Sequence, residues 1–141
     1  MGIPSRNSSS SMPLGNGHIG LNVWIEEDGD LLFYISKTDA WSENARLLKL
    51  GRVRVKFSPN PFSKGMLFSQ TLRLREAEIA IRAGNSESPL DLRLWVDANE
   101  PVIRVEAVAK HSFDLTAVLE TWRKTERNLE GKELQSAYGL E

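Results

Sequence analysis

The chain has 141 residues, 40% of them hydrophobic, which is enough for one domain with a buried core. Its 18 basic and 19 acidic residues leave a net charge of -1, so no overall field attracts nucleic acid or an anionic membrane surface. The absence of cysteine excludes disulfides and thiolate metal sites. No apolar run reaches the roughly 18 residues of a membrane span. Partners of this chain therefore have to be inferred from local features.

The N-terminal sequence MGIPSRNSSSS has neither the charged start nor the apolar centre of a signal peptide, which predicts a cytosolic chain or one already processed. Because Ser and Pro favour turns over ladders, residues 1–18 are predicted to form an extended lead-in segment. Residues 19–141 then form the folded domain. The C-terminal sequence SAYGLE ends without a turn or a helix cap. We therefore expect the chain to be a fragment of a longer protein.

The stretch SMPLGNGHIG contains G-x-G-x-x-G, formed by Gly15, Gly17 and Gly20. A dinucleotide site needs a strand before the first glycine and a helix after the third, because the helix N-terminus holds the phosphate. Here a Ser-rich coil ending in Met-Pro precedes the glycines, and a strand pattern follows them. The sequence therefore favours a structural role, in which Gly15 and Gly17 permit a tight, positive-φ turn into the first strand.

From Ile19 onward apolar residues recur with a period of two, which is typical of half-buried strands. The alternation covers residues 19–25 and resumes at 31–35 after the sequence EEDGD. Apolar residues of both strands share one face only if the loop has an odd number of residues. The pattern therefore predicts a three-residue loop, Glu27, Asp28 and Gly29, with Gly29 in the left-handed region.

The same alternation recurs downstream and gives about eight short strands. Turn signals such as SPNPF, AGNSESP and DANEP separate them, and this spacing predicts an antiparallel sandwich or barrel instead of alternating βα units. Helix is expected only over residues 42–50 and in the polar tail after Trp122. The downstream strands are predicted at residues 53–57, 72–75, 79–81, 90–96, 103–109 and 115–119.

Signals for catalysis or metal binding are weak. His18 and His111 are the two histidines, and neither has metal-ligand spacing around it. No G-x-S-x-G elbow occurs, so Ser-His-Asp hydrolysis has no support. The basic rows at 52–56 and 73–75 are interpreted as solvated strand faces. A predicted solvated hairpin tip holds a cluster of carboxylates, Glu26, Glu27, Asp28 and Asp30. We expect no catalytic residue, metal or cofactor in this chain.

Three tryptophans fall on the otherwise polar faces of their predicted strands: Trp24, Trp95 and Trp122. Single exposed aromatic residues need no explanation, but three on outward faces predict that those faces are partly covered. Two coverings fit, a neighbouring domain or sugar rings stacked on the indoles. The neighbouring domain is favoured, because tryptophan is a common anchor of protein interfaces.

The sequence SMPLGNGHIGLNVW resembles the start of the N-terminal β-sandwich of multidomain glycoside hydrolases of family 95. The continuation GDLLFYISKTDAWSENARLLKLGRVRVKFSPNPF is more similar to a bacterial family, domain of unknown function 5703, found in Bacteroides-like bacteria. The later sequence LRLWVDANEPVIRVEA also fits the strand pattern of that family. The resemblance therefore covers most of the chain.

The resemblance implies an all-β antiparallel β-sandwich, part of a larger sandwich that packs on an (α/α)6 barrel. Catalytic carboxylates would lie in the barrel, so this chain would be non-catalytic, in a periplasmic or extracellular protein. KTDAW matches the Asn-Glu-Asp-x-Leu-Trp stretch of fucosidase-type domains only at Asp39 and Trp41. Asn16, His18, Asp39 and Trp41 are the candidates for a loop cluster at the barrel or the domain contact. The alternatives are a structural role for Asn16 and Asp39, or a free-standing carbohydrate-binding module that uses Trp24, Trp95 or Trp122.

Overall fold

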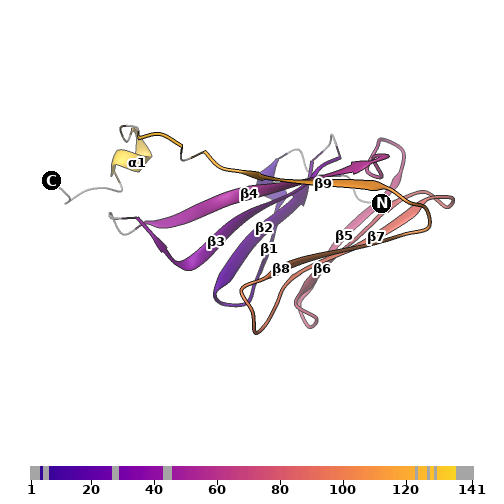
Figure 1. The fold of residues 1–141 in the computed structure, drawn as a ribbon, viewed down its shortest axis with the longest axis horizontal. Coiled ribbons are helices and arrows are strands. Elements are labelled where there is room, and N and C mark those ends of the chain that lie inside the picture. Colours follow the sequence, from indigo (N-terminus) through magenta and orange to yellow (C-terminus); the bar gives the residue numbers. More distant parts are fainter. Residues whose placement is uncertain are drawn as a thin grey trace.

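The computed structural model describes residues 4, 7–26, 29–42, 46–122, 124–126, 128 and 130–135. Within these residues, nine strands form two antiparallel sheets, one with the order β1-β2-β3-β4-β9 and the other with the order β5-β6-β7-β8. In Figure 1 the five-stranded sheet lies above the four-stranded sheet, and the two share one apolar core. The predicted all-β antiparallel sandwich is confirmed.

Every strand of the two sheets runs antiparallel to its neighbours. The five-stranded sheet contains β1 (Met12–Gly15), β2 (Ile19–Ile25), β3 (Leu31–Trp41), β4 (Leu47–Ser58) and β9 (Asp114–Glu120). The four-stranded sheet contains β5 (Leu67–Arg73), β6 (Glu78–Gly84), β7 (Pro89–Val96) and β8 (Ile103–Ala109). In the part of the chain that the structure describes, helical structure is limited to a 3-10 turn, η1 (Ser8–Ser10), and one short helix, α1 (Lys132–Gln135). Within the described residues, no helix is long and apolar enough to cross a membrane.

The core forms because inward-facing residues alternate with outward ones along each strand. On β2 the buried residues Leu21 and Val23 face the core, and on β6 Ile79 and Ile81 do the same. Gln70 of β5 joins the two layers, since its Nε2 donates to the carbonyl of Val23 at 3.3 Å. The sequence shows this same period of two, and the residues that it predicts to be buried do line the interior of the sandwich.

The hairpin between β2 and β3 follows the predicted geometry. Ile25 pairs with Leu31, and the backbone N–H of Glu26 donates to the carbonyl of Asp30 at 2.9 Å, which leaves three positions for the loop. Gly29 has φ +95°, as predicted. The other two predicted loop residues, Glu27 and Asp28, lie outside the described residues.

The glycine-rich turn leads from β1 into β2 and has no helix beside it. Gly17 has φ +91°, as the predicted turn requires. Gly15 does not have a positive φ; a Cβ there would lie 2.6 Å from the carbonyl oxygen of Ile19, so it is needed for close backbone approach. A strand on each side of the turn is the wrong context for a nucleotide fingerprint.

Two predictions about irregular segments need correction. Within the predicted lead-in segment, Met12–Gly15 is a strand, because Met12 and Leu14 alternate inward and the segment pairs with β2. The predicted helix over 42–50 is wrong where the structure describes it: residues 47–50 belong to β4, and Leu47 pairs with Trp41. Pairing with β3 overrides the helical propensity of Leu and Lys. Residues 43–45 of this prediction lie outside the described part.

Candidate functional site

Asn16 connects the glycine turn to the opposite sheet. Its Oδ1 accepts hydrogen bonds from the backbone N–H groups of His18 and Ile19, both at 2.9 Å. Its Nδ2 donates to the carbonyl of Asp97, at the end of β7, at 2.7 Å. All three bonds serve the fold, so the side chain of Asn16 acts as a turn cap and as a clamp between the sheets.

His18, Asp39 and Trp41 gather around Thr38 of β3. The backbone N–H of Thr38 donates to the carbonyl of His18 at 3.0 Å, and the indole N–H of Trp41 donates to the carbonyl of Thr38 at 2.6 Å. Asp39 forms an ion pair with Lys37, and the hydrogen bond from Lys37 lowers the pKa of Asp39. Trp41 is 57% exposed, and His18 and Asp39 are exposed as well. Of the four predicted cluster residues, His18 and Trp41 both bond to the backbone of Thr38, and Asp39 is the next residue along β3. Asn16 is bonded to His18 through its Oδ1, while its Nδ2 donates to the other sheet.

The outer tryptophans are covered to very different degrees. Trp24 is only 1% exposed, because it lies against Tyr34, with 5.0 Å between ring centroids. Trp122 packs edge-on against the same Tyr34 at 5.9 Å and is 49% exposed. Trp95 is half-buried, and the guanidinium of Arg93 lies 5.2 Å from its ring centroid. The predicted cover over Trp24 is thus supplied by the chain itself, and Trp24 has no surface on which a sugar could stack.

The carboxylates at the hairpin tip are not simply solvated, which corrects the prediction for Glu26 and Asp30. Arg54 lies on the outer face of β4 and donates to Asp30 at 2.7 Å, to Glu120 at 2.7 Å and to Glu26 at 3.2 Å. Hydrogen bonds from Arg54 and Arg52 lower the pKa of Glu120. The basic row at 52–56 is therefore part of a half-buried ionic network.

A second ionic group lies on the outer face of the four-stranded sheet. The carboxylate of Glu78, 4% exposed, accepts from Arg93 at 2.8 Å and from Arg73 at 2.9 Å. The hydrogen bond from Arg93 is the main reason that the pKa of Glu78 lies below its ordinary value. Each carboxyl with a displaced pKa in the described chain is shifted downward, whereas a general acid for sugar hydrolysis needs a raised pKa. The described residues also contain no group of three side chains that could hold a metal ion.

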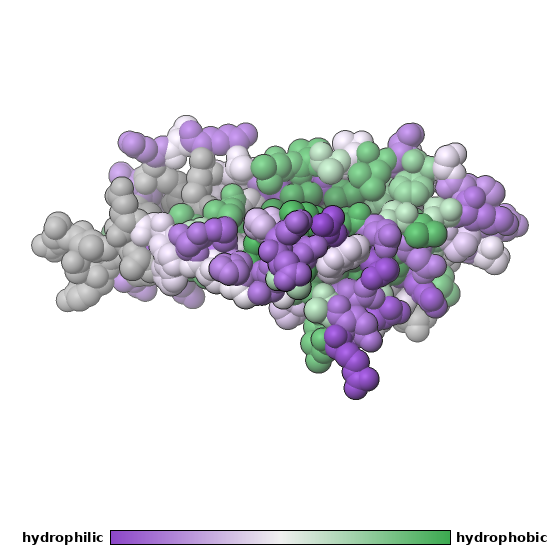
Figure 2. All heavy atoms as spheres, turned by 60° about the horizontal axis from the view of Figure 1, so that its bottom comes forward, coloured by the Kyte–Doolittle hydropathy of each residue, from purple (hydrophilic) through white to green (hydrophobic). Residues whose placement is uncertain are grey.

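The sandwich is open along one flank, between the edges of β8 and β9. Each of these strands ends its sheet and has one neighbour. Leu119 pairs with Val53 and Leu115 pairs with Phe57, so both leucines share the inward face of these core residues. Their side chains are nevertheless 65% and 46% exposed, respectively. Apolar side chains are visible as a broad exposed patch in Figure 2. We call this flank the open side, and its inward-facing residues are Ile103, Val105, Ala107, Ala109, Leu115, Ala117 and Leu119.

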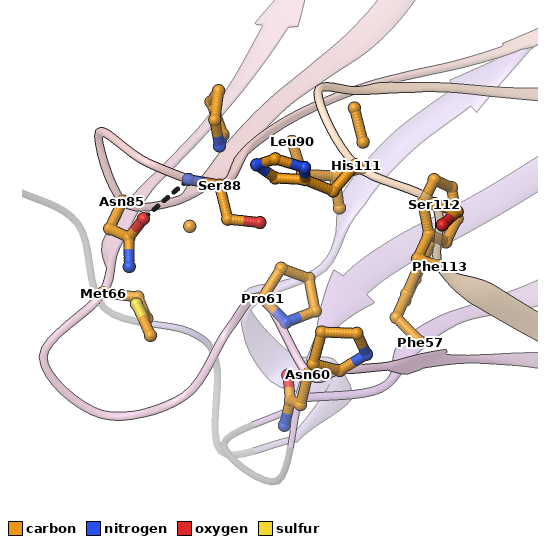
Figure 3. Close-up of a pocket in the computed structure, with 14 residues that line it drawn as sticks. Phe57, Asn60, Pro61, Met66, Asn85, Ser88, Leu90, His111, Ser112 and Phe113 are labelled. Atoms are coloured by element: carbon orange, nitrogen blue, oxygen red, sulfur yellow. Dashed lines mark hydrogen bonds between the residues drawn. The ribbon is translucent and has the colours of Figure 1, made fainter.

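A pocket of about 130 Å³ lies where three loops meet at one end of the sandwich. The loops are the β4–β5 connection, the β6–β7 turn and the β8–β9 connection. Figure 3 shows His111 and Ser88 facing Pro61 across this space, with Asn85 and Met66 at one end. We call it the loop-end pocket. The sequence pattern does not indicate this pocket, because its walls come from segments that are far apart in the chain.

These features define the class of the protein: an all-β sandwich domain with paired charges on its outer faces and an unpaired apolar flank. The model of a family described as domain of unknown function (DUF5703), N-terminal part, matches residues 2–140. The chain therefore belongs to this family. A comparison with curated proteins finds no match.

Proposed function

We propose that the chain is a non-catalytic N-terminal domain of a bacterial carbohydrate-active protein of the glycoside-hydrolase type. In this proposal it packs on a catalytic (α/α)6 barrel, and the whole protein works in the periplasm or outside the cell. The resemblance of SMPLGNGHIGLNVW to family 95 domains supports the carbohydrate context. The downward pKa shifts of Glu78 and Glu120 support a role without acid catalysis.

The open side is the single observation that carries the domain contact. An edge strand is normally protected by proline, a bulge or an inward-pointing charge. Strands β8 and β9 pair with their neighbours without register shifts, and their inward residues are all apolar. Burying the exposed remainder of a leucine such as Leu119 contributes about 1 kcal/mol. A partner that covers this flank thus gains both apolar burial and backbone pairing.

The test compares hydrogen exchange of the isolated chain with that of the same residues in the full natural gene product. We expect the amides of β8 and β9 to exchange more slowly in the larger protein. The substitution Leu119→Lys should lower the melting temperature of the larger protein more than Val118→Lys, since Val118 is the outward-facing neighbour on the same strand. Equal exchange in both proteins, or equal effects of the two lysines, would contradict the proposed contact.

A free-standing carbohydrate-binding module is the second candidate function. It is favoured by Trp41 and Trp122, whose indoles are half exposed and can accept a stacked sugar ring. Calorimetric titration with a glycan panel tests this candidate. Binding that is lost in Trp41→Ala or Trp122→Ala, and kept in Trp95→Ala, would support the module and displace the scaffold proposal.

A further inference from the structure

We propose that the loop-end pocket binds one neutral pyranose ring. The proposal goes beyond the domain contact and does not depend on it, because the pocket is formed by three loops and the contact by the β8 and β9 edges. Loops carried on a rigid sheet framework are the usual place for binding residues. The lining of the pocket comes from both sheets. Pro61 follows β4 and Ser112 leads into β9, both in the five-stranded sheet, while Ser88 lies in the β6–β7 turn of the four-stranded sheet.

The size of the pocket selects a single ring. Its volume is about 130 Å³. An engineered apolar cavity of about 150 Å³ takes up benzene, so a volume of this order holds one six-membered ring. A disaccharide or a nucleotide would extend far outside the loops.

The lining selects a neutral ligand with one apolar face. None of the 14 lining residues is Asp, Glu, Lys or Arg, so a phosphate or carboxylate would find no ion pair there. Phe57 and Leu90 form a buried apolar floor, and Pro61 and Met66 are half-buried beside it. A pyranose ring has an apolar face of C–H groups that can lie on this floor, and it needs hydrogen bonds only around its rim.

Polar groups of the pocket are available for that rim. Within the described chain no hydrogen bond uses Asn85 Nδ2, Ser88 Oγ or a ring nitrogen of His111. A purely apolar ligand would take these groups out of water without giving them partners, which is unfavourable. Hydroxyls can both donate to and accept from all three. The lining therefore matches a ring that carries hydroxyl groups better than a hydrocarbon ring.

The three loops are held in place before any ligand arrives. Asn85 Oδ1 accepts from the backbone N–H groups of Ser88 at 2.8 Å and Glu87 at 3.0 Å, which fixes the β6–β7 turn. The N–H of Gly84 donates to the carbonyl of Pro61 at 3.0 Å and links this turn to the β4–β5 connection. Phe57 contacts Phe113 with 6.0 Å between ring centroids, which anchors the third loop. Preorganised loops lose less entropy on binding.

The experiment follows backbone amide shifts of the full chain by NMR during titration with methyl glycosides of glucose, galactose, mannose and fucose. Cyclohexanol and glucuronate are the comparison ligands, the first without the hydroxyl rim and the second with a charge. We expect at least one neutral glycoside to shift the amides of Ser88, His111 and Ser112. The Kd expected for such a small ligand is on the order of 1–10 mM, and titration to about 50 mM covers it.

Three variants locate the binding. Ser88→Ala and Asn85→Asp each remove one donor, and the aspartate keeps the Oδ1 acceptor that holds the turn. Each should weaken binding about 3- to 10-fold. Ser86→Ala is the matched control, since Ser86 is exposed in the same turn and does not line the pocket. It should leave the Kd unchanged.

Several results would overturn the proposal. One is the absence of pocket shifts with every neutral glycoside. A second is binding of cyclohexanol or glucuronate as tight as that of the best glycoside. A third is a set of shifts confined to Trp41 and Trp122, which would move carbohydrate binding to the indoles and support the second candidate function instead.

Discussion

Replacing Glu78 by Gln tests whether the ionic group on the outer face stabilises the fold. The glutamine keeps the size of the side chain and removes its charge. Hydrogen bonds to a charged group contribute about 1.5–3 kcal/mol each, and Glu78 accepts one from Arg73 and one from Arg93. The two arginine side chains are 47% and 53% exposed, so water recovers much of the loss. We therefore expect Glu78→Gln to lower the free energy of unfolding by about 1–2 kcal/mol at neutral pH.

The pH dependence gives the same experiment a second readout. The pKa of Glu78 is lower in the folded chain than its ordinary value, chiefly because Arg93 donates a hydrogen bond to the carboxylate. A lowered folded pKa means that the stabilisation is fully present above the unfolded value of about 4.3. It is lost as the pH falls through the folded pKa. The difference between wild type and Glu78→Gln should therefore shrink in acid.

Urea denaturation at neutral pH and in acid measures both effects. The matched control is Glu106→Gln, since Glu106 contacts the same Arg93 at 3.3 Å but is half exposed. Its effect should stay within about 0.5 kcal/mol. Equal losses of unfolding free energy in the two variants at neutral pH would refute the expected role of Glu78. A Glu78→Gln effect that persists unchanged at low pH would refute it as well.

Four further substitutions have distinct expected effects. Gly29→Ala should lower the free energy of unfolding by roughly 2 kcal/mol or more. Gly17→Ala should lower it by about 1 kcal/mol in urea denaturation, because Gly17 has a similar φ but open space for the added Cβ. Asn16→Asp should keep the turn but lose the bond to Asp97, which lowers the melting temperature by about 4 °C. Trp24→Ala should destabilise by about 3–5 kcal/mol in the same assay, because the side chain is fully buried.

The strands could be predicted because the alternation that indicates each strand lies within its own residues. A period of two identifies residues 103–109 as a strand, and β8 has these bounds in the structure. The same holds for Gly29, since the parity of the loop follows from the apolar residues beside it. The helix predicted over 42–50 fails for the opposite reason. Its residues have helical propensity, but β3 supplies a pairing partner that the local sequence does not reveal.

The site features could not be predicted because they depend on contacts across the sheets. Arg54 meets Asp30, which is 24 positions away, and Glu120, which is 66 positions away. The alternation of residues predicts the correct face for Trp24, but the burial of Trp24 depends on the ring of Tyr34 from the next strand. Likewise, the loop-end pocket requires three connections to meet at one end of the sandwich. The exposure of a charged side chain or an indole on a strand face therefore cannot be predicted until the strand register is known.

The two kinds of surface on this domain favour different partners. On the outer faces, Arg54 and Glu78 already have ion partners within the chain, so another protein that covered them would replace existing bonds instead of adding new ones. At the open side, Leu115 and Leu119 are turned toward the core but remain in contact with water. Covering them adds apolar burial with no charge to desolvate. The proposed domain contact is therefore most favourable at the β8 and β9 edges, and the outer faces can stay in solvent.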